Sequence, residues 1–236
     1  MAEQNAVDAQ LSLERFIRGT PDAIGAEAVT IVTTRGDIAL RYYAAAGATT
    51  VGGAIFVGSA EEGQPRPAGG QLYPAVCKAL VTAGVACVEL SFRTPDDFHE
   101  CVLDVLGAMA FLDECDAAPV ALVAHSLSSA SAVQVALLSP DVGACALLSA
   151  VAFEDAEEYL PHLGPRCAML YVHGALDLAT PLKVAQQMFE LTSEPKQWLP
   201  VPDVGHALDS ADDTAIVSAL SQWIVTALQR PEARND

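Results

Sequence analysis

Basic residues are scarce in this chain. Its 12 Lys and Arg residues stand against 30 Asp and Glu residues, which gives a formal net charge of −18 at pH 7. A surface of this sign repels phosphate backbones and anionic headgroups, so the charge argues against nucleic acid and against a membrane surface as partners. The acidity is compatible with an ordinary solvated surface or with adaptation to high salt.

Long apolar runs and paired cysteines are also missing. No apolar stretch approaches the ~18 uninterrupted residues of a membrane-spanning helix, and residues 1–5 lack the pattern of a signal peptide. The six cysteines form no CxxC pair, and Cys87, Cys145 and Cys167 fall in apolar runs, which predicts buried thiols and no disulfide framework. The histidines show no metal-ligand spacing. We therefore expect a cytoplasmic protein without a metal or other cofactor.

Aromatic residues make up only 6% of the chain, whereas hydrophobic residues make up 52%. Alanine, valine and leucine must therefore build the core, and their density excludes a disordered chain. A length of 236 residues is compatible with one domain. We expect an N-terminal extension over residues 1–27, a single domain over 28–228 and a polar tail over 229–236.

Short apolar runs recur along this domain, and segments with helical spacing lie between them. The runs expected to be strands lie at 54–57, 87–90, 120–124, 144–148, 167–172 and 197–201. Helical spacing marks 73–81, 98–112 and 216–224. Residues 28–33 and 38–43 read as an antiparallel hairpin. The pattern predicts an α/β fold with a mostly parallel central sheet, an N-terminal antiparallel hairpin and helices on both faces.

Three polar residues follow three of the expected strands. Ser126 follows the strand at 120–124, Asp177 follows the strand at 167–172, and His206 follows the last one. The carboxyl ends of parallel strands meet at one edge of a sheet, so these residues are expected to lie together. A serine hydroxyl becomes a nucleophile when a histidine takes its proton and a carboxylate orients the imidazole.

The motifs around these residues resemble the α/β-hydrolase superfamily, in which serine, acid and histidine follow one another in this order. They are AHSLS at 124–128, HGALD at 173–177 and GH at 205–206. The resemblance covers roughly residues 28–228 and is greatest to small esterases, thioesterases and dienelactone hydrolases with a minimal lid. It implies that Ser126 is the nucleophile, His206 the base and Asp177 the acid. The alternative acids are Asp203, Glu154 and Asp155.

The AHSLS motif corresponds to the family's nucleophile elbow, the tight turn that carries the serine. It departs from the usual elbow sequence Gly-x-Ser-x-Gly, because Ala124 and Ser128 replace both glycines. The resemblance also implies an oxyanion hole formed by the amides of Leu127 and Ser59, with Gly58 and Ala60 as neighbouring candidates. The loop residues expected to line the substrate site are Gly58, Ala60, Phe92, Arg93, Val151, Phe153, Leu178 and Leu208. Arg93 would either bind an anionic substrate group or pair with Glu89. His125 and His173 are expected to pack the loops.

The sequence therefore predicts a serine hydrolase that cleaves a small-molecule carboxylic ester or thioester through an acyl-enzyme. Two alternatives remain open at this stage. The missing elbow glycines allow a non-catalytic binding module, and the same site would also serve an acyltransferase or perhydrolase. The sequence makes no prediction of the oligomeric state.

Overall fold

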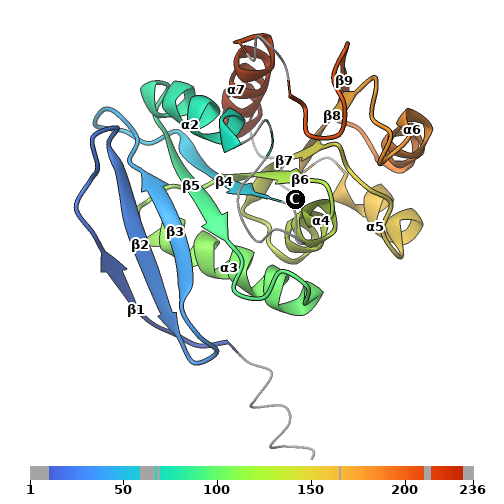
Figure 1. Cartoon of the computed structure of the whole chain (residues 1–236). Coiled ribbons are helices and arrows are strands. Elements are labelled where there is room, and N and C mark those ends of the chain that lie inside the picture. The colour runs from blue at the N-terminus through green and yellow to red at the C-terminus, as the bar shows by residue number, and fades with distance from the viewer. Residues whose placement is uncertain (1–10, 59–66, 68–69, 165, 210–213, 231–236) are drawn as a thin grey trace, which may run out of the picture.

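A single twisted sheet runs through the molecule (Figure 1). The computed structural model describes residues 11–58, 67, 70–164, 166–209 and 214–230. Within these ranges the sheet has nine strands in the order β1-β2-β3-β5-β4-β6-β7-β8-β9. The strands are β1 (Leu13–Arg18), β2 (Ala26–Thr33), β3 (Ile38–Tyr43), β4 (Gly52–Val57), β5 (Val85–Ser91), β6 (Val120–His125), β7 (Val142–Leu148), β8 (Ala168–Gly174) and β9 (Lys196–Val201).

Strand pairing changes from antiparallel to parallel across the sheet. Strands β1, β2, β3 and β5 pair antiparallel in succession, whereas β5, β4, β6, β7, β8 and β9 pair in parallel. Strands β4, β6 and β8 are buried at every position, since helices cover both of their faces. The predicted α/β class, with its mostly parallel sheet and N-terminal hairpin, is confirmed.

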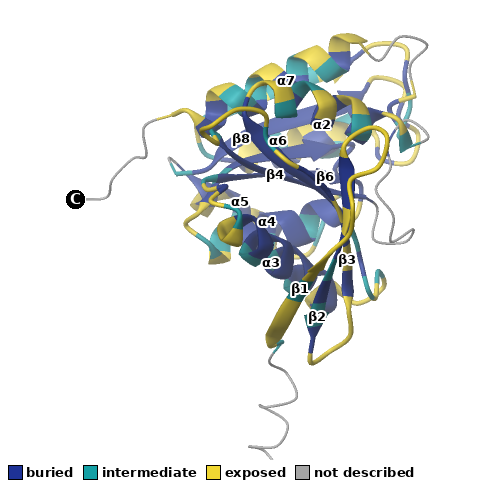
Figure 2. Cartoon of the chain, turned by 90° about the vertical axis from the view of Figure 1, so that its left-hand side faces the viewer, coloured by how far each residue is buried: buried dark blue, intermediate teal, exposed yellow. Residues whose placement is uncertain are grey.

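The helices form one layer on each face of the sheet (Figure 2). Their bounds are α2 (Leu72–Thr82), α3 (Phe98–Glu114), α4 (Ser128–Leu138), α5 (Ala156–Leu163), α6 (Leu182–Leu191) and α7 (Thr214–Leu228). Helices α2 and α7 share one hydrophobic cluster with the sheet, and α3, α4 and α5 share the other. Helix α6 packs beside α5 and β8. Among the described residues between β7 and β8, α5 is the one helix or strand, so a lid there would be small.

Strand β1 lies within the segment that was expected to be an N-terminal extension. It pairs antiparallel with β2 at the edge of the sheet. Phe16 packs edge-on against Phe111 of α3, with ring centroids 5.4 Å apart, and the Arg18 guanidinium pairs with Glu27. The segment therefore adds a strand to the domain.

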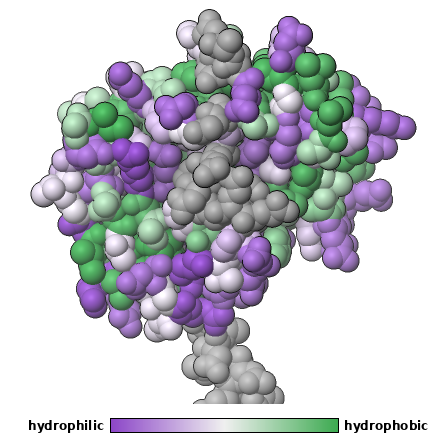
Figure 3. All heavy atoms as spheres, in the orientation of Figure 1, coloured by the Kyte–Doolittle hydropathy of each residue, from purple (hydrophilic) through white to green (hydrophobic). Residues whose placement is uncertain are grey.

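The surface and the thiols agree with the composition. Hydrophilic and hydrophobic residues are interspersed over the face shown in Figure 3. The cysteines are all free, and each is buried except the half-buried Cys115. Among the described residues no helix is both long and apolar enough to cross a membrane.

Candidate active site

Ser126, His206 and Asp177 form a continuous hydrogen-bonded chain. Ser126 Oγ lies 2.8 Å from His206 Nε2, and His206 Nδ1 lies 2.8 Å from Asp177 Oδ2. The three residues follow β6, β9 and β8 respectively, so the carboxyl edge of the parallel sheet brings them together. This geometry lets His206 take the serine proton while the Asp177 carboxylate holds the imidazole.

Ser126 lies on a strained turn between β6 and α4. Ser126 has a φ of 58°, a left-handed conformation that costs a residue with a side chain about 1–2 kcal/mol. Its amide donates to Leu148 O of β7 at 2.9 Å, and its carbonyl accepts from the Ser129 amide at 3.1 Å. The turn closes although Ser128 stands where the motif has glycine, and Ser128 is only 1% exposed.

Asp177 is the carboxylate that contacts His206 in the described part of the chain. Its Oδ1 atom accepts hydrogen bonds from the amides of Ala179 and Thr180, at 2.9 and 2.8 Å. The alternative acids Asp203, Glu154 and Asp155 are exposed, and no hydrogen bond joins them to His206. Helix α6 begins at Leu182, after Pro181, and has no side-chain cap.

Two buried histidines, His173 and His125, contact backbone carbonyl oxygens in the loops around Ser126, His206 and Asp177. The ring of His173 is buried, and its Nε2 atom lies 2.9 Å from Thr180 O and 3.4 Å from Asp177 Oδ2. The Nε2 atom of His125 lies 2.9 Å from the carbonyl oxygen of His206. Both residues therefore pack the loops that carry Asp177 and His206.

The loops that carry the acid and the base are in direct contact. The amide of Leu176 donates to Val204 O at 2.9 Å, and that of Ala175 donates to Val201 O at 2.8 Å. A Cβ atom at Gly174 would lie 2.6 Å from Val204 O, closer than real side chains approach a backbone. Glycine in the HGALD motif thus permits the approach that sets Asp177 beside His206.

Leu127, the first predicted oxyanion donor, lies at the N-terminus of α4. Leu127 precedes α4, and its amide donates no hydrogen bond within the part of the chain that the structure describes. A helix N-terminus favours developing negative charge. Gly58 is buried at the end of β4, next to β6 in the sheet. Ser59 and Ala60 lie outside the described residues, so the second donor stays a prediction.

The expected substrate-lining residues fall into different environments. Leu178 is 95% exposed beside Asp177, and Val151 is half-buried after β7. Phe92 and Leu208 are buried, one in each of the two hydrophobic clusters, so their place in the substrate site stays a prediction. Leu208 turns inward because its backbone is left-handed, with a φ of 55°.

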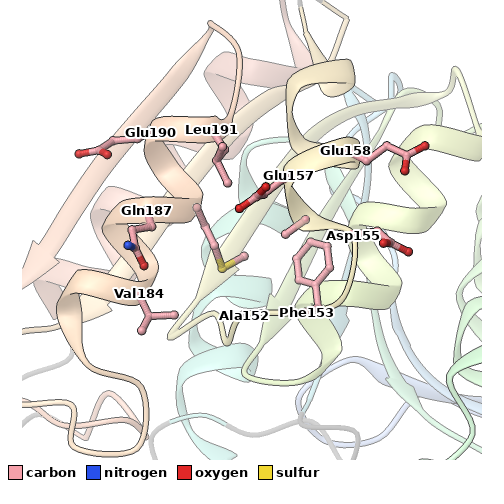
Figure 4. A pocket seen from close by; sticks show the side chains of 11 residues that line it. Ala152, Phe153, Asp155, Glu157, Glu158, Val184, Gln187, Glu190 and Leu191 are labelled. Atoms are coloured by element: carbon pink, nitrogen blue, oxygen red, sulfur yellow. The ribbon is translucent and has the colours of Figure 1, made fainter.

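Phe153 lines a groove of about 720 Å³ between α5 and α6 (Figure 4). The ring of Phe153 and the carboxylate of Glu157 both point into the groove, whereas the carboxylates of Glu158 and Glu190 point away from it. Ser126, Asp177 and His206 are not among the residues that line it. This groove therefore adjoins the elements that carry the acid without containing the reacting groups.

Arg93 belongs to a buried ion-pair network. Its amide donates to Asp104 Oδ2 at 2.8 Å, its guanidinium also pairs with Asp104, and Nη2 lies 2.7 Å from Glu100 Oε2. The expected pair with Glu89 is absent, because Glu89 is hydrogen-bonded to Tyr43. The Arg35 hydrogen bonds hold the pKa of Glu100 below its ordinary value, whereas burial raises the pKa of Asp104. Arg93 thus joins the β5–α3 connection to helix α3.

No metal centre was found in the described ranges, where no three His, Cys, Asp or Glu side chains are grouped to hold an ion. The buried thiols of Cys77 and Cys145 have pKa values well above the ordinary value, since burial disfavours the thiolate. These cysteines are therefore neutral and provide no second nucleophile.

Known proteins resemble this chain in structure and not in sequence. No protein-family model matches it, and no curated protein matches it in sequence. The esterase domain of a Rhodothermus marinus protein superimposes with a TM-score of 0.69 at 19% identity, covering 92% of this chain and 99% of that one. Est1E from Butyrivibrio proteoclasticus gives a TM-score of 0.71 at 13% identity, with 86% and 99% covered.

A dienelactone hydrolase from Anabaena variabilis gives a TM-score of 0.65 at 17% identity, covering 85% of this chain and 95% of that one. The similar chains are covered almost completely, so the likeness extends over the whole domain and not over one motif. The chain therefore has the α/β-hydrolase fold.

Proposed function

We propose that this protein is a serine hydrolase that cleaves a carboxylic ester or thioester through an acyl-enzyme. The observation that carries the proposal is the hydrogen-bonded chain from Asp177 through His206 to Ser126, with 2.8 Å at each link. Esterases and a dienelactone hydrolase share the fold at TM-scores of 0.65–0.71, which supports hydrolytic chemistry.

The first half of the reaction forms the acyl-enzyme. Ser126 Oγ attacks the carbonyl carbon of the substrate while His206 Nε2 accepts the hydroxyl proton. The Leu127 amide stabilises the resulting oxyanion, an interaction whose loss typically costs about a hundredfold or more in rate. The C–O or C–S bond then breaks, and His206 returns its proton to the departing alkoxide or thiolate.

The second half releases the acid. A water molecule gives its proton to His206 Nε2 and attacks the acyl carbon, and the ester bond to Ser126 breaks as His206 protonates the serine oxygen. Asp177 stays ionised throughout and stabilises the imidazolium that forms twice in the cycle. Its Oδ1 atom is held by two backbone amides, which leaves Oδ2 to serve His206.

A non-catalytic role was suggested by the replaced elbow glycines. Two observations favour a working site. Ser126 adopts the left-handed turn, with a φ of 58°, and the small buried residues Ala124 and Ser128 pack around it. Acyl transfer or perhydrolysis would use the same residues with another acceptor, and product analysis distinguishes those reactions from hydrolysis.

Labelling with a fluorophosphonate tests the proposal. The wild type is expected to be labelled and to hydrolyse short p-nitrophenyl esters, whereas Ser126→Ala is expected to do neither. Ser139→Ala, at the far end of α4, is the matched control and should behave as wild type. Equal labelling of wild type and Ser126→Ala would overturn the assignment, and circular dichroism verifies that the variants are folded.

A further inference from the structure

A second groove, of about 390 Å³, adjoins the nucleophile. One wall is the first turn of α4 and the residue before it, and the other is the loop that leads from β5 into α3. The residues that matter here are Leu127, Ala130 and Ser131 on the first wall and Pro95, Phe98 and Cys101 on the second. Ser126 is not among the lining residues, but Leu127 follows it directly in the chain, so the groove lies next to the turn that carries Ser126.

Local structure makes this groove apolar. Leu127, Ala130 and Ser131 are spaced i, i+3 and i+4, which puts them on one face of α4. Phe98 is 52% exposed and Leu127 is 40% exposed, although both are large hydrophobic residues. Exposed apolar side chains on facing walls indicate a surface that binds another apolar group.

Apart from Asp96, the polar side chains in the walls are already hydrogen-bonded or neutral. The Ser131 hydroxyl donates to Ser128 O at 2.9 Å, so it offers no hydrogen to a ligand. Burial raises the pKa of the Cys101 thiol to about 12, and the thiol contacts the carbonyl oxygens of Thr94 and Pro95. Asp96 brings a carboxylate to the lining. The groove therefore favours an uncharged chain and disfavours a chain that ends in a carboxylate.

The sheet order tells which part of the substrate enters this groove. Asp177 and His206 reach Ser126 from β8 and β9, whereas the loop with Pro95 and Phe98 follows β5, on the other side of β6. The leaving group must lie on the His206 side, because His206 Nε2 protonates it. The acyl chain then points away from His206, toward the wall that β5 and α3 provide.

We infer that the groove between α4 and the β5–α3 loop is the acyl-chain site, and that the substrates are esters of short or medium, uncharged acyl groups. The inference rests on the proposed function. The groove has a volume of about 390 Å³, near the lower end of the ~300–1,000 Å³ range of small-molecule pockets. This volume limits the length of the acyl chain.

A series of p-nitrophenyl esters from acetate to dodecanoate tests the inference. In the wild type kcat/KM should rise about fourfold for each added methylene, equivalent to ~0.8 kcal/mol, until the groove is full, and should rise no further beyond that length. Ala130→Trp should fill the groove and shift the best chain to a shorter length. Leu138→Trp is the matched control, because Leu138 is 57% exposed at the other end of α4 and should keep the wild-type profile.

A monoester of a dicarboxylic acid tests the role of Asp96. Wild type should hydrolyse it at least about tenfold more slowly than the uncharged ester of equal length, and Asp96→Asn should reduce the difference. An unchanged difference would overturn this part of the inference.

Small fluorophosphonates separate the two proposals, since they react with Ser126 without needing the groove. If Ala130→Trp is labelled as fast as wild type but keeps the wild-type chain-length profile, the groove is not the acyl site and the proposed function stands. If wild type itself is not labelled and cleaves no ester, both proposals fail. Should Ala130→Trp not fold, Ala130→Leu gives the same test with a smaller expected shift.

Discussion

Gly174 lies against the backbone of Gly205, so closely that a side chain at 174 has no space. An added Cβ atom would be 3.0 Å from the carbonyl carbon of Gly205 and 2.6 Å from Val204 O. Residue 174 ends β8 just before the acid, and residue 205 immediately precedes the base. The contact therefore sets the separation of the two loops on which Asp177 and His206 depend.

Replacing Gly174 by alanine should push these loops apart. We expect a loss of about 1–3 kcal/mol in the free energy of unfolding, because the overlap is with backbone and not with a flexible side chain. We also expect kcat to fall about a hundredfold, since a shift near 1 Å disrupts catalytic alignment. Gly143→Ala is the matched control, as the nearest atom to its new Cβ would be 3.6 Å away. Equal activity of both variants would contradict the proposed role of Gly174.

Asp177→Asn should lower kcat about 10⁴-fold while leaving the fold intact, because the amide no longer holds the productive tautomer of His206. Steady-state kinetics on a short p-nitrophenyl ester measure this loss. Asp203→Asn should retain wild-type activity, since Asp203 is exposed and makes no hydrogen bond to His206. A large loss in Asp203→Asn with none in Asp177→Asn would transfer the acid role to Asp203.

Glu100→Gln should weaken the domain at neutral pH and much less in acid. The Arg35 hydrogen bonds hold the folded-state pKa of Glu100 below the unfolded value of about 4.3. A depressed folded pKa stabilises the protein fully above about pH 4.3, and this stabilisation is lost as the pH falls through the folded pKa. We expect a cost of about 1–3 kcal/mol at pH 7, because two arginines lose a charged partner.

Urea unfolding over a range of pH measures the effect. The difference between wild type and Glu100→Gln should shrink below pH 4, where the wild-type carboxyl also becomes neutral. Glu157→Gln, on the exposed surface of α5, should stay within about 0.5 kcal/mol of wild type at every pH. A pH-independent difference would show that Glu100 acts through packing and not through its charge.

The negative charge of the protein should make it cleave anionic thioesters more slowly than neutral ones. The net charge of −18 and the acidic residues along the α5–α6 groove repel a polyanionic leaving group such as coenzyme A. At about 20 mM salt we expect kcat/KM for a coenzyme A thioester to be at least about tenfold below that of a neutral thioester with the same acyl group. Raising the salt to about 0.5 M should narrow the gap, and equal values at low salt would contradict this prediction.

The strands and the triad could be predicted from the sequence because their signals are local and ordered. Parallel strands such as β6 and β8 are buried at every position, which gives unbroken apolar runs. Ser126 and Asp177 follow such runs, whereas His206 follows the partly exposed strand β9. Strand β1 was missed because five of its six residues are exposed and the sixth is half-buried, so no apolar run marks it.

Side-chain partners were harder to predict, because they depend on how helices pack. Arg93 faces Asp104 once α3 packs on the sheet, and no sequence spacing distinguishes that partner from Glu89. Leu208 turns into the core through a left-handed backbone that a leucine seldom adopts. The groove at Leu127 likewise arises where two segments meet, so the linear sequence carries no pattern for it.

The exposed edge strand β1 should separate from the sheet in local fluctuations that leave the rest of the domain folded. Strand β1 touches the rest of the domain chiefly through β2, Phe16 and Arg18, whereas β6, β7 and β8 lie in the centre of both hydrophobic clusters. Amide protons of β1 should therefore exchange with solvent through local fraying, while those of β6 and β8 exchange only when the whole domain unfolds. Strands β6 and β8, which precede Ser126 and Asp177, should thus belong to the most slowly exchanging part of the chain. Local fraying of β1 should therefore leave the distances between Ser126, His206 and Asp177 unchanged.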